Sequence, residues 1–191
     1  MNGGVGNDVY YVNDAGDSVV EVAGGGIDTV YASVNFNMGA GTEVEYLYAT
    51  GGGALSLTGS NFANTIIGNA AANKIYGGLG NDMLTGGLGK DIFVFDTKPN
   101  KSTNVDRIMD FNVRDDSFHL DNKYFTKLGS GTASRPKKFN SDMFEINNKA
   151  KDREDRIIYD KKTGALYYDQ DGTGSKAQIK IATLNKNLKL T

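Results

Sequence analysis

Residues 68–96, GNAAANKIYGGLGNDMLTGGLGKDIFVFD, contain a pattern that repeats every nine residues. At this period four units are in register over residues 59–94, each with a polar sixth residue and an apolar eighth residue. The sixth positions are Asn64, Asn73, Asp82 and Asp91, and the eighth positions are Ile66, Ile75, Leu84 and Phe93. The last three residues of a unit suffice only for a short strand whose inward side chain is the eighth residue. We therefore predict that each unit is a loop followed by a short strand.

The glycines and the aspartate of a complete unit predict a loop lined with oxygen atoms. Glycines at the first, second and fourth positions permit positive φ and let backbone carbonyls approach a ligand. The aspartate adds a carboxylate, so the loop offers the all-oxygen environment that Ca²⁺ prefers. If two units make one turn of a coil, loops two units apart stack about 4.8 Å from each other. Loop 59–64 then lies beside loop 77–82, and loop 68–73 lies beside loop 86–91.

Two units, residues 77–85 and 86–94, match the pattern G-G-x-G-x-D-x-U-x in full. The chain therefore resembles the RTX (repeats-in-toxin, hemolysin-type calcium-binding) family. The resemblance implies an all-β fold, a right-handed parallel β-roll with Ca²⁺ in its loops and a β-rich cap at the carboxy-terminal end. The alternative is an ordinary β-solenoid with glycine-rich turns and no metal. It does not explain why paired glycines and an aspartate recur at a fixed offset.

The same pattern occurs near the start of the chain. Residues 2–11, NGGVGNDVYY, contain a complete nonapeptide, and residues 23–31, AGGGIDTVY, replace only the first glycine. Asp8 and Asp28 hold the sixth positions, so we expect them to flank one cation. Because solenoids usually begin with a modified capping repeat, a complete repeat here favours a fragment of a longer protein. Residues 32–58 keep strand signals without the glycine register, which predicts a continued solenoid or an antiparallel excursion, without metal.

Residues 105–120, VDRIMDFNVRDDSFHL, resemble the D-x-I-x-D-F segment that closes the roll in serralysin-type RTX modules. The resemblance implies that Asp106 and Asp110 help to complete the last calcium sites. The alternative is two exposed aspartates around a buried strand.

The predicted metal-site residues are Gly3, Gly4, Gly6, Asp8, Gly24, Gly26, Asp28, Gly68, Asn69, Asn73, Gly77, Gly78, Leu79, Gly80, Asp82, Gly86, Gly87, Leu88, Gly89, Asp91, Asp106 and Asp110. The neutral asparagine loops predict weaker sites, and their occupancy is open.

Composition and charge divide the chain into two parts. Residues 1–100 hold 20 of the 25 glycines and carry 10 acidic and 3 basic side chains, whereas residues 101–191 carry 13 acidic and 18 basic. Glycine content and charge therefore predict two modules that meet near residue 96. The resemblance to the RTX family implies that residues 1–96 form an RTX β-roll and that residues 97–191 form a capping and secretion-related β region. The acidic roll favours cations and argues against nucleic acid as a partner. The basic cap favours docking against the roll.

The carboxy-terminal part contains further local signals. Residues 128–140 predict a basic loop, and residues 156–169 predict a β-hairpin whose turn ends at Gly164. Residues 169–174, DQDGTG, predict an aspartate–glycine turn, with a metal site at Asp169 and Asp171 as the alternative. Residues 177–184 predict a last strand. This end resembles the segment that follows RTX repeats in exported proteins, although its terminus, NLKLT, lacks the acidic-then-apolar ending of some relatives.

Several classes of activity lack their sequence signals. The chain has no cysteine, no apolar run of the roughly 20 residues that a membrane span needs, and no H-E-x-x-H, G-x-S-x-G or G-x-x-x-x-G-K-[ST] motif. The single histidine, His119, lies in a strand pattern and is predicted to be structural. We therefore expect no enzymatic activity from this chain itself, and a catalytic part of the parent protein, if there is one, lies elsewhere.

The aspartates of the loops predict a calcium-triggered folding switch, and the resemblance to the RTX family implies that the module is secreted and extracellular; we expect it to be a monomer. Repulsion among Asp8, Asp28, Asp82, Asp91 and Asp106 keeps the chain loose where calcium is scarce, which suits passage through a transporter. The resemblance implies that this transporter is a type I (ABC transporter) secretion apparatus. Millimolar calcium outside the cell then folds it. Two alternatives for the parent stay open: a secreted serralysin-like protease or other hydrolase, and a calcium-dependent bacterial adhesin.

Overall fold

The computed structural model describes residues 1–131 and 135–190, so part of the predicted basic loop, residues 132–134, lies outside the described residues. Its strands form two sheets. The ten-stranded sheet contains, in spatial order, β1 (Val9–Val12), β2 (Thr29–Ala32), β4 (Tyr46–Ala49), β6 (Thr65–Ile67), β8 (Met83–Thr85), β10 (Asp106–Ile108), β15 (Ile179–Thr183), β14 (Ala165–Tyr168), β13 (Ile157–Asp160) and β12 (Phe144–Glu145). The five-stranded sheet contains β11 (Ser117–Leu120), β9 (Ile92–Phe95), β7 (Lys74–Tyr76), β5 (Ser56–Thr58) and β3 (Phe36–Asn37). A short 3-10 helix, η1, covers Ser141–Met143.

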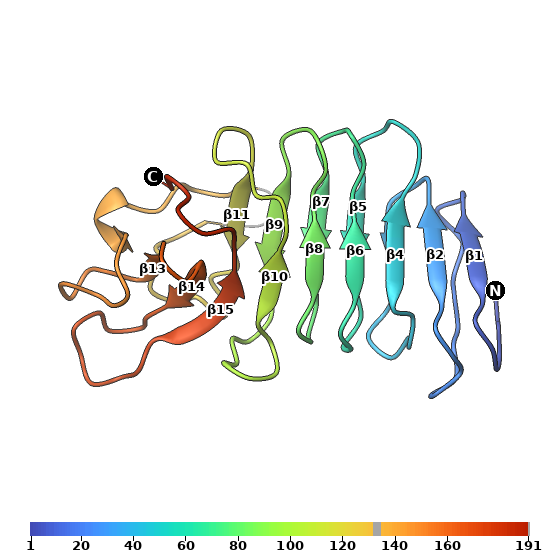
Figure 1. Cartoon of the computed structure of the whole chain (residues 1–191), viewed down its shortest axis with the longest axis horizontal. Coiled ribbons are helices and arrows are strands. Elements are labelled where there is room, and N and C mark those ends of the chain that lie inside the picture. Colours follow the sequence, from blue (N-terminus) through green and yellow to red (C-terminus); the bar gives the residue numbers. More distant parts are fainter. Residues whose placement is uncertain (132–134, 191) are drawn as a thin grey trace.

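From β2 to β11 the strands alternate between the two sheets, so two short strands and two loops make one turn of a coil. Strands one turn apart pair in parallel, with Ile66 beside Leu84 and Ile75 beside Phe93. Figure 1 shows the turns standing side by side along the long axis, from β1 at the N-terminal end to the cap at the other. The predicted all-β class and parallel β-roll, with two nonapeptides in each turn, are confirmed.

The interior of the coil is filled by the eighth residues of the repeats. Ile66, Ile75 and Phe93 are fully buried, and their neighbours along each strand are more exposed. This alternation follows from the period of two residues that every strand has, because one side chain in two faces inward. Full burial of each such side chain contributes about 1.5–3 kcal/mol relative to its exposure. The inward ladder is therefore a main source of stability for the roll.

Residues 32–58 continue the solenoid and make no antiparallel excursion. β3 pairs with β5 in parallel, and β4 pairs in parallel with both β2 and β6. The reason is that Leu47 and Leu57 supply fully buried inward side chains although the glycines of this segment are out of the nonapeptide register. On the outward face of β1, β2 and β4, the rings of Tyr11, Tyr31 and Tyr48 stack, with neighbouring ring centroids 5.5 and 5.3 Å apart.

The two sheets do not end at Asp96, where the predicted roll ends. β10 adds to β8 and β11 adds to β9, both in parallel, and then β15 pairs with β10. The predicted hairpin forms from β13 and β14, with φ of 79° at Gly164. These strands extend the ten-stranded sheet past β10 and cover an edge that would otherwise expose unpaired backbone groups. The division into units at Asp96 and the likeness of the cap to serralysin-type modules stay predictions.

The predicted last strand is confirmed as β15. In the described part of the chain, no helix has the length and apolar character of a membrane span.

Candidate calcium-binding loops

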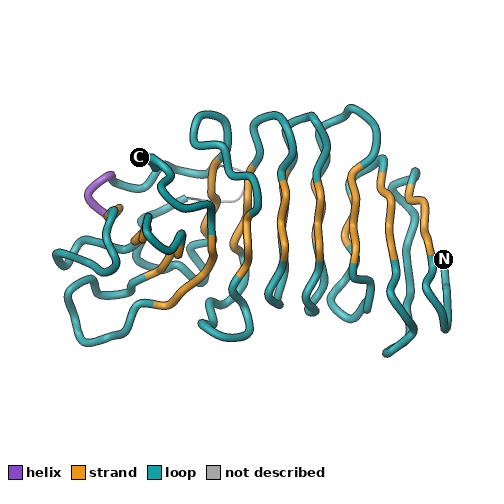
Figure 2. Tube along the Cα trace, viewed as in Figure 1, coloured by secondary structure: helices purple, strands orange, loops and turns teal. Residues whose placement is uncertain are grey.

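The loops of the coil gather on two opposite flanks, seen as the two rows of turns in Figure 2. We call the loops that precede strands of the ten-stranded sheet the first flank, and those that precede strands of the five-stranded sheet the second flank. On each flank the last loop residue before a strand occupies the same place in successive turns. In the repeat loops this residue is Asn64, Asn73, Asp82 or Asp91. This stacking places residues that are far apart in sequence next to each other.

A hydrogen-bond ladder connects the turns on the first flank. The backbone N–H of Asp8 donates to Asp28 Oδ1 at 2.8 Å, and the N–H of Asp28 donates to Glu45 Oε2 at 2.7 Å. The N–H of Asn64 donates to Asp82 Oδ1 at 2.8 Å, and the N–H of Asp82 donates to Asp106 Oδ1 at 3.2 Å. The side chains of Asp28, Glu45, Asp82 and Asp106 therefore each accept a bond from the turn before them. The predicted pairing of loops 59–64 and 77–82 is confirmed.

The second flank repeats the arrangement. The N–H of Leu55 donates to Asn73 Oδ1 at 3.3 Å, that of Asn73 to Asp91 Oδ1 at 2.8 Å, and that of Asp91 to Asp116 Oδ1 at 2.9 Å. The predicted pairing of loops 68–73 and 86–91 is thus confirmed. Asp116 was not predicted, because it follows Asp91 by 25 residues whereas Asp91 follows Asn73 by 18. Its position directly before β11 is the sequence signal that identifies it.

One carboxylate oxygen in each aspartate loop has no hydrogen-bond partner among the described residues. These buried atoms are Oδ2 of Asp8, Asp28, Asp82 and Asp91. In Asp28, Asp82 and Asp91 the other oxygen, Oδ1, accepts a ladder hydrogen bond. A buried carboxylate oxygen without a partner is costly, and carboxylates of this kind are normally paired or coordinate a metal. The donor set consists of oxygen atoms only, which fits Ca²⁺.

The glycines of loop 77–82 provide the space for these oxygens in two different ways. Gly78 and Gly80 have φ of 95° and 124°, and a Cβ on Gly78 would collide with the carbonyl oxygen of Ser60 in the preceding turn. Gly77 does not have positive φ, contrary to our expectation for first-position glycines. It is needed because a Cβ there would collide with Asp82 Oδ2.

Loop 86–91 has the same construction, with φ of 95° at Gly87 and 115° at Gly89. A Cβ on Gly86 would collide with Asp91 Oδ2, and one on Gly87 would collide with the carbonyl oxygen of Asn69. The N-terminal loops again have positive φ at their second and fourth residues, which are Gly4, Gly6, Gly24 and Gly26. Carbonyl oxygens of one turn therefore face the next turn across glycines.

The two leucines among the predicted site residues face solvent. The side chains of Leu79 and Leu88 are 39% and 73% exposed. Neither side chain offers a ligand atom, so these residues are able to contribute only their backbone oxygens.

The asparagine loops satisfy their own polar groups. Asn64 Oδ1 accepts from the N–H of Ser60 at 2.8 Å, and its Nδ2 donates to the carbonyl oxygen of Val44 at 2.7 Å. Asn73 Nδ2 donates to Asn69 Oδ1 at 3.0 Å and to the carbonyl oxygen of Ala71 at 2.5 Å. The side-chain amides of Asn64 and Asn73 therefore form hydrogen bonds, whereas the corresponding aspartate in loops 77–82 and 86–91 has a carboxylate oxygen without a partner. The backbone carbonyl oxygens of the two asparagine loops still face the positive-φ glycines of the next turn, for example that of Ser60 at Gly78 and that of Asn69 at Gly87.

Asp106 and Asp110 lie in different surroundings. Asp106 is 5% exposed, accepts from Asp82, and its Oδ2 would lie 3.2 Å from a Cβ on Gly77. The two oxygens of Asp110 accept from the N–H groups of Gly86 and Gly87 at 2.9 and 2.8 Å. Asp106 therefore shares the surroundings of Asp82 on the first flank, whereas Asp110 anchors the start of loop 86–91.

Residues 169–174 form the predicted aspartate–glycine turn. Asp169 Oδ1 accepts from the N–H groups of Asp171 and Gly172 at 3.1 and 3.0 Å, and Gly172 has φ of 60°. The alternative of a metal site at Asp169 and Asp171 stays a hypothesis.

Stacking of carboxylates changes their acidity in the calcium-free chain. Burial, and then the neighbouring charge of Asp106, raises the pKa of Asp82 to about 8. Burial raises the pKa of Asp106 to about 7. Burial is also the largest cause of the raised pKa of Asp91. In the absence of a cation, the folded roll therefore holds protons that the unfolded chain releases.

This difference predicts that the calcium-free chain holds more β structure at pH 5 than at pH 8. Because the folded pKa values lie above the unfolded value of about 3.9, the folded state binds more protons between about pH 4 and pH 8, and stability falls as pH rises. Far-UV circular dichroism of resin-stripped protein across this range measures the effect. Asp82→Asn should flatten the pH profile. A β signal that increases with pH would contradict the prediction.

Comparison with known proteins agrees with this geometry. Residues 58–93 match the family model of the RTX calcium-binding nonapeptide repeat, in four copies. No curated protein sequence gives a significant match to the chain. The matched span contains the two asparagine loops and the two aspartate loops that the structure stacks in pairs. Residues 58–93 are therefore RTX calcium-binding nonapeptide repeats.

Proposed function

We propose that the chain is a calcium-triggered folding and export module of a larger extracellular protein. The observation that supports this is the set of buried aspartate oxygens without partners on both flanks, at Asp8, Asp28, Asp82 and Asp91. Like charges buried at close range oppose folding, whereas a cation between them favours it. Because the sites do not exist in the unfolded chain, calcium binding free energy becomes folding free energy.

The export part of the proposal rests on the RTX repeats, which are typical of proteins that a type I apparatus secretes. A chain that stays loose at low calcium suits a transporter, and the cap strands β13 to β15 cover one edge of the roll once it has formed. In this proposal the module is a secreted monomer. It contributes no catalytic group, so any catalytic activity belongs to other parts of the parent protein.

Calorimetric calcium titration at several temperatures tests whether binding and folding are one event. Coupled folding buries apolar surface, so the heat capacity change of binding should be about −1.2 to −1.5 kcal/mol/K for every 100 residues that fold. Binding to loops that are already folded would give a small fraction of that value. Tight calcium binding with a heat capacity change near zero would refute the folding switch and leave calcium binding itself intact.

A further inference from the structure

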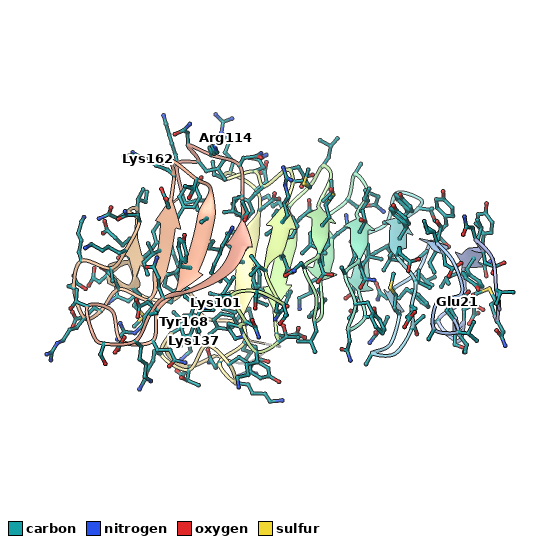
Figure 3. All side chains as sticks on the ribbon, turned by 60° about the horizontal axis from the view of Figure 1, so that its bottom comes forward. Glu21, Lys101, Arg114, Lys137, Lys162 and Tyr168 are labelled. Carbon is teal, nitrogen blue, oxygen red and sulfur yellow. The ribbon has the colours of Figure 1, made fainter. Side chains whose placement is uncertain are left out.

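We propose that Asp8, Glu21 and Asp28 form a calcium site with three carboxylate ligands at the N-terminal end of the solenoid. The inference rests on the proposed calcium-binding function and adds a ligand, Glu21, that the nonapeptide pattern does not contain. The site lies outside residues 58–93, which match the repeat family. Figure 3 labels Glu21 among the loops near the N-terminal end.

The distances fit a single cation. One carboxylate oxygen from each of the three residues lies within 4.8 Å of the other two. Calcium binds oxygen at about 2.3–2.6 Å, so two ligand atoms on opposite sides of one ion lie about 4.6–5.2 Å apart. The three oxygens are therefore close enough to coordinate the same ion.

The burial of these groups distinguishes them from an acidic surface cluster, in which water satisfies the carboxylates. Asp28 is fully buried and Glu21 is 8% exposed. Both carboxylate oxygens of Glu21 and Oδ2 of Asp8 and Asp28 are buried without a hydrogen-bond partner among the described residues. The hydroxyl of Tyr10, a residue that is 5% exposed, is also buried without such a partner. Four side chains therefore have oxygen atoms without hydrogen-bond partners in the same buried region.

The local fold explains how Glu21 reaches the loop of Asp8. Val20, directly before it, forms a parallel bridge with Asn2, and the N–H of Val20 donates to the carbonyl oxygen of Met1 at 2.9 Å. A Cβ on Gly3 would collide with Asp8 Oδ2, Glu21 Oε1 and the hydroxyl of Tyr10. Glycine at position 3 thus leaves the space in which these three groups meet.

The charge of the site indicates its ligand. Three carboxylates give a formal charge of −3, and higher ligand charge raises the affinity of a calcium site. Mg²⁺ fits less well, because it demands near-ideal octahedral geometry and loses its water reluctantly. We therefore expect this site to bind Ca²⁺, and trivalent lanthanide ions in its place, more tightly than loops that contain an asparagine.

Terbium luminescence tests the site directly, because a bound Tb³⁺ ion emits when a nearby tyrosine is excited. We expect this site to fill at the lowest Tb³⁺ concentration, and we call the emission that saturates there the first phase. Tyr10→Phe should remove the first phase, because the sensitising tyrosine is lost. In the wild-type chain, excess Ca²⁺ should also remove the first phase. Glu21→Gln, which has the same size, should raise the Tb³⁺ midpoint of the first phase at least tenfold. The matched control Glu154→Gln makes the same change at an exposed residue in the cap region and should leave the midpoint unchanged.

The outcome separates this site from the function of the module. Circular dichroism and calorimetry with calcium establish first that the Glu21→Gln chain folds and binds ions through its other loops. If it does, and its terbium midpoint equals that of the wild type, Glu21 is not a ligand and the inference is wrong. Emission that does not change in Tyr10→Phe would equally overturn it, because the ion would then lie elsewhere.

Discussion

Removal of calcium is expected to abolish most of the far-UV circular dichroism signal of the β-sheets, and return of calcium is expected to restore it. On the first flank Asp82 and Asp106 lie one turn apart, and both are buried. On the second flank Asp91 and Asp116 lie one turn apart; Asp91 is buried and Asp116 is half-buried. Without a cation, the burial of these charges opposes the stacking of the turns. Excess Mg²⁺ should not restore the signal, since its small octahedral shell fits these loops poorly.

The double substitution Asp82→Asn and Asp91→Asn identifies the loops responsible. An asparagine oxygen still accepts the ladder hydrogen bonds from Asn64 and Asn73, but the charged oxygen that faces the cation is lost. The calcium concentration at the folding midpoint should rise at least tenfold, which corresponds to about 1.4 kcal/mol or more. Asp142→Asn, at an exposed aspartate in the cap region, is the matched control. A complete β signal in chelator would contradict calcium-dependent folding. An unchanged midpoint in the double variant would show that Asp82 and Asp91 do not hold the ions that drive folding.

The repeat spacing predicted the central part of the molecule because each local signal there has a single structural consequence. An apolar eighth residue must face inward, and two units must complete a turn, so Ile75 and Phe93 fall in the same register. The same spacing places Asn64 against Asp82, which the ladder hydrogen bond confirms. In this region the sequence period and the structural period coincide.

The parts that were missed lie where the turns depart from the length or the glycine register of the nonapeptide. Asp116 follows Asp91 by 25 residues, so a strict period of two nonapeptides does not find it. Glu21 lies outside both N-terminal repeats, between residues 3–11 and 23–31, and its carboxylate meets that of Asp8 only because the chain coils back. Residues 32–58 remain in the solenoid because the inward side chains of Leu47 and Leu57, and not glycine loops, determine that the chain coils.

Phe93→Ala is expected to lower the free energy of unfolding by about 3–5 kcal/mol at saturating calcium, as large-to-small substitutions of buried phenylalanines do. Phe93 is fully buried, and its ring centroid lies 6.1 Å from that of Phe111 and 6.4 Å from that of Phe118. It therefore joins the last repeat to the strands that continue the roll beyond Asp96. Urea denaturation with calcium in excess measures the loss. Leu88→Ala, at a leucine that is 73% exposed, is the control and should cost less than about 0.5 kcal/mol.

The same variant tests whether the core and the ion sites form together. The side chain of Phe93 has no ligand atom, yet it is fully buried and lies two residues after Asp91 in the sequence. If calcium binding and folding are one equilibrium, a less stable core must raise the calcium midpoint of folding, because more binding free energy is then needed to complete the roll. A Phe93→Ala chain with lowered stability but an unchanged calcium midpoint would show that the loops bind their ions before the core is packed.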